Sequence, residues 1–91
     1  MPMNKGVLAA IDDFSAALKI NPADVDAILN RALAYRKLPR YDQALQDYNE
    51  AIRLASGDAD AYRGRARVHE AMGSPDLAEG DRAQAQAIDL A

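Results

Sequence analysis

The sequence has 91 residues, no cysteine, no tryptophan and a formal net charge of −3. It can therefore hold neither a disulfide framework nor a thiolate metal site, and its acidic balance argues against general nucleic-acid binding. The first residues contain no apolar run of the signal-peptide type and no segment is long enough to cross a bilayer, so we expect a cytoplasmic protein.

Five amphipathic helices are predicted from apolar residues that recur at spacings of three and four. Their expected ranges are residues 5–20, 23–38, 40–55, 58–72 and 75–89. Asn21 is expected to cap the second helix with Pro22 in its first position, and Pro39 ends the second helix. Gly73 ends the fourth helix and Ser74 caps the fifth. Because the connections are short, successive helices should be antiparallel.

The second and third helices are repeated by the fourth and fifth at one constant offset along the chain. Identical pairs mark the repeat at Asp26/Asp60, Ala27/Ala61, Arg31/Arg65, Ala32/Ala66, Asp42/Asp76, Ala44/Ala78, Asp47/Asp81 and Ala51/Ala85. The shared alanines let helices approach closely. The shared arginines are expected to pack their methylene stems while their guanidinium heads stay in water. A period of this length is typical of stacked repeats.

The pattern resembles the tetratricopeptide repeat, a helix–turn–helix unit with the same period. Its first-helix signature is carried by Ile28, Arg31, Ala32 and Tyr35, and again by Tyr62, Arg65, Ala66 and His69. Its second-helix signature is carried by Ala10 with Phe14, Ala44 with Tyr48 and, weakly, Ala78 with Arg82.

The resemblance implies an all-α fold, a right-handed superhelix of about five antiparallel helices in a single domain over residues 1–91. Residues 5–22 would be the second helix of a truncated first repeat. Residues 23–56 would be a full repeat, and residues 57–91 a full repeat with a C-terminal capping helix.

The resemblance also implies a protein or peptide partner that binds in the concave groove formed by the first helix of each repeat. Helical spacing directs two sets of residues toward that groove, namely Asp26, Leu29, Asn30, Leu33, Arg36 and Lys37, and Asp60, Arg63, Gly64, Arg67, Glu70 and Ala71. We single out Asn30, Leu33, Lys37, Arg63 and Arg67, with the two arginines placed to hold a carboxylate. The alternative is that these are ordinary solvated side chains. A chaperone-type carboxylate clamp is not expected, because only Asn30 matches it.

The helix at residues 5–20 lacks the partner helix that would complete its repeat. Its apolar residues Val7, Ile11, Phe14 and Leu18 would then be partly uncovered, which favours a homodimer through this face. The alternatives are cover by Met1 and Met3 or a neighbouring repeat in a longer array. A structural role as a homodimer is therefore the second hypothesis for function.

No residues form a catalytic, metal-binding or cofactor-binding set. His69 is the only histidine and takes a buried aromatic position of the repeat, so we expect it to be packed rather than catalytic. The aspartates are too scattered for a metal site, and glycine-rich phosphate loops are absent. We therefore expect a non-enzymatic interaction protein that binds neither nucleic acid nor membrane.

Overall fold

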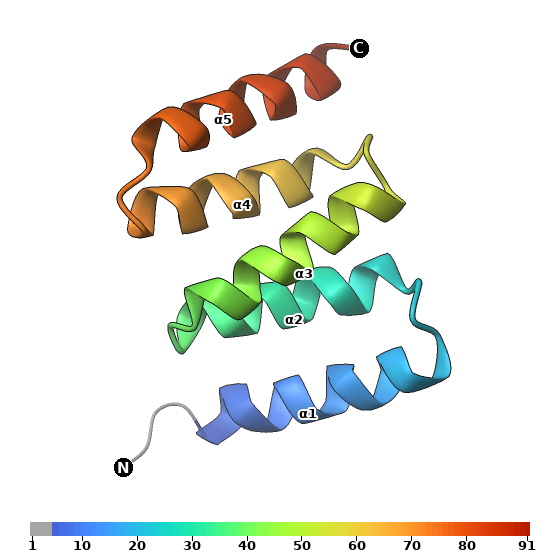
Figure 1. The fold of residues 1–91 in the computed structure, drawn as a ribbon. Helices are drawn as coiled ribbons and strands as arrows, with labels where there is room; N and C mark the ends of the chain where they lie inside the picture. Colours follow the sequence, from blue (N-terminus) through green and yellow to red (C-terminus); the bar gives the residue numbers. More distant parts are fainter. Residues whose placement is uncertain (1–4) are drawn as a thin grey trace.

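The computed structural model describes residues 5–91, which form five helices joined by short turns (Figure 1). The helices are α1 (Lys5–Ile20), α2 (Val25–Lys37), α3 (Tyr41–Leu54), α4 (Ala59–Ala71) and α5 (Pro75–Leu90). Successive helices run antiparallel and stack from α1 at one end to α5 at the other. This confirms the prediction of an all-α solenoid. The suggested cover by Met1 and Met3 lies outside the described residues.

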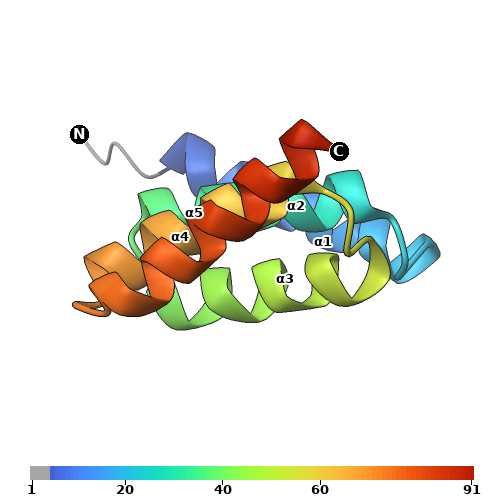
Figure 2. The same cartoon turned by 90° about the horizontal axis from the view of Figure 1, so that it is seen from above.

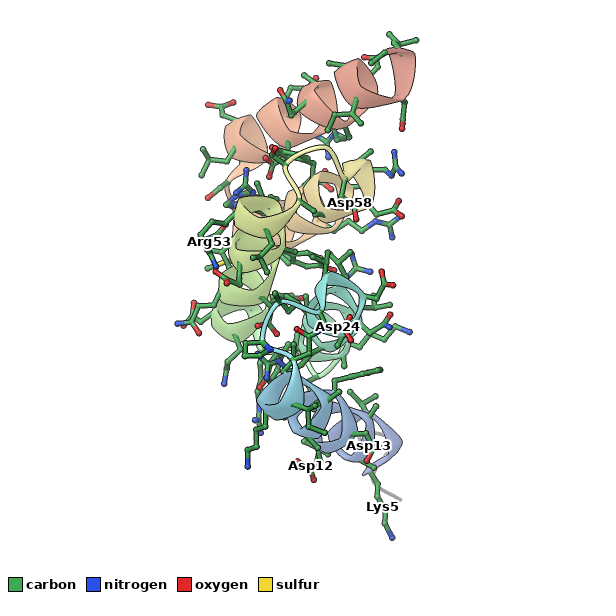
Figure 3. All side chains as sticks on the ribbon, turned by 90° about the vertical axis from the view of Figure 1, so that its right-hand side faces the viewer. Lys5, Asp12, Asp13, Asp24, Arg53 and Asp58 are labelled. Carbon is green, nitrogen blue, oxygen red and sulfur yellow. The ribbon has the colours of Figure 1, made fainter. Side chains whose placement is uncertain are left out.

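The start of α2 corrects two predictions. The helix begins at Val25, so Pro22 lies in the turn before it and not in its first position. The capping side chain is that of Asp24, which accepts a hydrogen bond from the Ala27 backbone N–H at 3.1 Å. Asn21 instead accepts from the backbone N–H of Ala23 at 3.2 Å, so it stabilises the preceding turn. A carboxylate here also meets the positive end of the helix dipole. Asp58, one repeat later, caps α4 through the Asp60 N–H at 3.0 Å, as Figure 3 allows the reader to follow.

The turn between α4 and α5 ends α4 where the sequence predicted. Gly73 has a φ of 81°, a conformation that glycine adopts without steric cost, and Ser74 donates its N–H to the carbonyl of His69 at 2.8 Å. Ser74 occupies the cap position of α5, but its side chain makes no capping hydrogen bond. Pro75 is the first residue of α5, where a missing N–H costs nothing.

Alanine allows the helices to pack closely. Ala32, Ala44, Ala51, Ala61 and Ala78 are 0% exposed. Ala32 and Ala44 form one cluster with Tyr48 and Val68, so this cluster joins α2, α3 and α4. Figure 2 shows α3 displaced to one side of α2 and α4. The helices α2 and α4 therefore form an inner layer, and α3 lies outside it.

Two arginines connect neighbouring helices and correct the prediction that their heads stay in water. Arg31 of α2 donates to both carboxylate oxygens of Asp47 on α3, at 2.8 and 2.9 Å, and to the hydroxyl of Ser15 on α1 at 3.1 Å. The buried carboxylates explain the difference, because an ion that leaves water needs a paired charge. Asp47 is 7% exposed.

The same bridge recurs one repeat later. Arg65 of α4 donates to both oxygens of Asp81 on α5, at 2.9 and 2.7 Å, and to Asn49 of α3 at 2.9 Å. Each arginine thus joins three successive helices. Hydrogen bonding to these carboxylates raises the pKa of Arg31 and of Arg65.

Candidate functional site

A groove of about 600 Å³ lies between the inner helices α2 and α4. Its walls and floor are formed by Asp26, Leu29, Asn30, Leu33, Arg36, Tyr48, Asp60, Arg63, Gly64 and Arg67. All but Tyr48 were directed toward this surface by helical spacing alone. The groove is open to solvent.

The structure brings together four of the five residues singled out for ligand binding: Asn30, Leu33, Arg63 and Arg67 line the groove. Lys37 does not, and instead lines a smaller cleft of about 250 Å³ between α1 and α2. Position 37 is one residue further around the α2 helix than Arg36, and this rotation turns it toward α1. Arg36 takes its place as the basic residue of α2 in the groove.

The two groove arginines of α4 differ in their partners. Arg63 donates to Asp60 at 2.5 Å and to Asp89 of α5 at 2.7 Å, so its guanidinium is committed to the protein's own carboxylates. These hydrogen bonds raise the pKa of Arg63. Arg67 and Arg36, by contrast, have no ion pair with any carboxylate of residues 5–91. Arg36 and Arg67 are therefore the two groove arginines that no carboxylate of residues 5–91 neutralises.

Tyr48 of α3 is the groove residue that the sequence did not place there. It reaches the inner surface because Gly64 of α4 has no side chain: a Cβ at this position would lie 2.6 Å from the Tyr48 hydroxyl oxygen. The missing Cβ lets the ring fill the space between α2 and α4 and form the floor of the groove. The signal was present in the sequence as a glycine inside a predicted helix, where glycine is unfavourable without a packing reason.

The phenol of Tyr48 lies in a mixed environment. Burial raises its pKa above the ordinary value of 10.0, and the positive charges of Arg36 and Arg67 partly offset this rise. At neutral pH the phenol carries its proton and can donate a hydrogen bond to a ligand.

Tyr48 should make the protein less stable in alkali. A group whose folded-state pKa is raised contributes stability that is complete below pH 10.0 and is lost as the pH rises from 10.0 through the folded-state value. We expect Tyr48→Phe to reduce the loss of unfolding free energy between pH 9 and about pH 11. Urea unfolding at a series of pH values measures this. If the unfolding free energy of Tyr48→Phe changed with pH as steeply as that of the wild type, the phenol would ionise alike in the folded and unfolded chains.

Comparison with known proteins finds a similar family. Residues 33–73, from the middle of α2 to the end of α4, match the family model described as a TPR repeat. The matched stretch covers less than half of the chain, which is thus similar to the TPR repeat family over this part. No curated protein sequence matches it.

Solved structures of tetratricopeptide repeat proteins share the fold. A crystal structure of MamA is similar with a TM-score of 0.89 at 26% identity, covering 96% of this chain and 51% of MamA. The TPR domain of Arabidopsis OM64 gives 0.89 at 27% identity, with 92% and 69% covered. The second TPR of Spaghetti (RPAP3), bound to the HSP90 peptide SRMEEVD, gives 0.87 at 24% identity, with 92% and 78% covered. The chain thus spans about half the length of MamA.

The apolar residues of α1 are not all exposed on one open face, as the predicted dimer interface would require. Ile11 is only 7% exposed, and Leu18 packs against the cluster that contains Ile28 of α2. The proposed interface therefore loses these two residues to α2, because the neighbouring repeat covers that side of α1. Val7 and Phe14 are half-buried and line the cleft between α1 and α2.

His69 is packed, as the repeat predicts for an aromatic position. Its side chain is 14% exposed and its Nε2 atom lies 3.7 Å from Asp81 Oδ2. Within residues 5–91 there is no group of three or more histidine, cysteine, aspartate or glutamate side chains that could hold a metal ion. None of the helices described is long and apolar enough to cross a membrane.

Proposed function

We propose that this protein-interaction module binds an extended peptide in the groove between α2 and α4, with an acidic ligand residue seated between Arg36 and Arg67. The observation that carries the proposal is the pair of guanidinium groups that flank the Tyr48 floor without an acidic partner in the described chain. A ligand carboxylate there would accept charge-assisted hydrogen bonds, which are stronger than hydrogen bonds between neutral groups.

The distribution of charge along the groove supports a ligand whose opposite charges are separated along its length. Asp26 and Asp60 stand in the first turns of α2 and α4, while Arg36 and Arg67 stand nearer the C-terminal ends of these helices. Asp60 is already paired with Arg63, so among residues 5–91 Asp26 is the groove carboxylate without an ion pair at one end, and the guanidinium groups of Arg36 and Arg67 lie toward the other end. A peptide with a basic residue followed or preceded at a distance by an acidic one would match both ends, and complementary charge favours specificity and fast association.

The relatives add general support for peptide binding. The RPAP3 structure holds a peptide with three acidic residues, SRMEEVD, on the same fold. Here Asn30 is available for a peptide backbone, since an exposed side-chain amide can both donate and accept. The half-buried Leu33 adds an apolar contact beside it.

The proposal predicts a specific loss of affinity for Arg67→Ala. We would measure binding by fluorescence polarisation with labelled ten-residue peptides that differ only in the number and position of glutamates. Affinity for the best acidic peptide should fall about ten-fold in Arg67→Ala, equivalent to about 1.4 kcal/mol, and further in the Arg36→Ala, Arg67→Ala double variant.

The matched control is Arg53→Ala. Arg53 lies on the outer helix α3 (Figure 3), is paired with Glu50 and is not among the residues that line the groove. This variant should bind the peptides as the wild type does. Equal affinity of wild type and Arg67→Ala for every acidic peptide would exclude the proposed seat.

The second candidate, a homodimer through α1, has a narrower basis than the sequence suggested. With Ile11 buried, the larger apolar residues left accessible on α1 include the half-buried Val7 and Phe14, together with Leu8 and Ile20, which are 42% and 88% exposed. We therefore place groove binding first.

A further inference from the structure

The two arginine–aspartate bridges occupy equivalent positions of the two full repeats. The donors Arg31 and Arg65 are one repeat apart, and so are the acceptors Asp47 and Asp81. In both copies the arginine comes from the first helix of a repeat and the aspartate from the second. The bridge is thus a recurring feature of the repeat and not an isolated contact.

Asp13 of α1 is the same position one repeat earlier, since it precedes Asp47 by the same interval at which Asp47 precedes Asp81. Asp47 and Asp81 are buried under their arginines, whereas Asp13 is exposed and no cation of residues 5–91 pairs with it. Figure 3 shows Asp12 and Asp13 on α1 at the end of the stack. The acceptor of a third bridge is therefore present without its donor.

The cleft between α1 and α2 provides the apolar part of the same arrangement. Its lining includes Ala10, Phe14 and Ala34, which are the repeat equivalents of Ala44, Tyr48 and Val68. Those three residues enclose Ala32, the neighbour of Arg31, in one buried cluster. The cleft thus reproduces the surface on which an arginine-bearing helix already packs elsewhere in this molecule.

The opposite end of the stack does not offer this surface. On α5 the position equivalent to Phe14 and Tyr48 is Arg82, which pairs with Glu70 at 3.2 Å and with Glu79 at 3.3 Å. Charged groups at this position pair with one another, so the apolar side chain found at Phe14 and Tyr48 is missing there. Only the α1 end, among the surfaces described, combines an apolar cleft with an acceptor of the repeated bridge.

We propose that the open face of α1 binds an amphipathic helix of a partner polypeptide. The partner helix presents an arginine followed by an alanine on its contact face. The arginine pairs with Asp13, and the alanine packs between Ala10, Phe14 and Ala34. The contact of Arg31 and Ala32 with α3 is the existing example of this arrangement, and it shows which residue types would meet and how they would be placed. This inference rests on Asp13 and the cleft between α1 and α2, and not on Arg36 and Arg67, although Asn30 and Leu33 line both the cleft and the groove.

The test uses a labelled peptide of residues 24–40, the segment that contains α2, as the probe. It should bind the full chain, and Asp13→Asn should weaken binding more than ten-fold. Asp12→Asn is the matched control, because Asp12 is also exposed on α1 but is not the repeat equivalent of Asp47. A probe with Arg31→Gln should bind the wild type weakly, and Asp13→Asn should weaken it no further. Circular dichroism checks that the variants remain folded.

Three results would overturn the proposal. The first is a probe that does not bind. The second is a probe that binds Asp13→Asn and the wild type equally, as it would if it exchanged with α2 and paired with Asp47. The third is sedimentation of the chain alone as a dimer that Asp13→Asn dissociates, which would assign the surface to a second copy. The Arg67→Ala variant should bind the probe normally, so failure here leaves the proposed groove function standing.

Discussion

Replacing Asp47 by alanine should lower the free energy of unfolding by about 3 kcal/mol, and the midpoint of thermal unfolding by roughly 15 °C. The reason is that Asp47→Ala removes the carboxylate that receives two hydrogen bonds from Arg31 and leaves a partly buried guanidinium without its counter-charge. The value is at the low end for a broken buried pair, because the Arg31 side chain keeps 24% of its surface in solvent.

Two comparisons isolate this effect from the loss of any charged pair. Glu50→Ala removes the partner of Arg53 on the outside of α3, where both side chains are exposed, and should leave the unfolding midpoint unchanged. The Arg31→Met, Asp47→Leu double variant removes both charges and should recover more than half of the stability lost in Asp47→Ala. Thermal unfolding of the three variants would measure this. If Asp47→Ala unfolded at the same midpoint as Glu50→Ala, the bridge would contribute nothing to the stack.

The second large effect is expected at Gly64. Gly64→Ala should destabilise the protein by about 2 kcal/mol, although alanine normally favours a helix over glycine. The added methyl group would overlap the buried Tyr48 ring, so either this ring or the α3–α4 packing must shift. Because the ring forms the floor of the groove, the variant should also lose affinity for the acidic peptides.

Gly80 offers a matched control of opposite sign. It lies inside α5, and a Cβ added there would meet no atom within 4 Å. Gly80→Ala should therefore raise the unfolding free energy by up to about 1 kcal/mol through helix propensity alone. Urea unfolding of both variants gives the comparison. A Gly64→Ala protein as stable as Gly80→Ala would show that Tyr48 can move away without cost.

The groove shows what helical spacing can and cannot predict about a site. Asn30 with Leu33 on α2, and Arg63 with Arg67 on α4, were predicted to face one surface because residues three and four apart share a side of a helix, and the structure places them there. Spacing could not show that Asp89, which lies 26 residues after Arg63, would neutralise that arginine. Nor could it show that the Tyr48 ring passes from the outer helix to the inner surface.

The sequence by itself determined the helices, their order and the repeat. Apolar periodicity, Pro39, Gly73 and short connections act within a few residues, so α1 and the other helices begin and end within two residues of their predicted limits. The tertiary structure alone decided which charges pair. Arg31 with Asp47, and Arg65 with Asp81, stood in the sequence as identical residues of a repeat, but their contact depends on the register of two antiparallel helices. That register is set by alanine packing across the interface, and local patterns do not encode it.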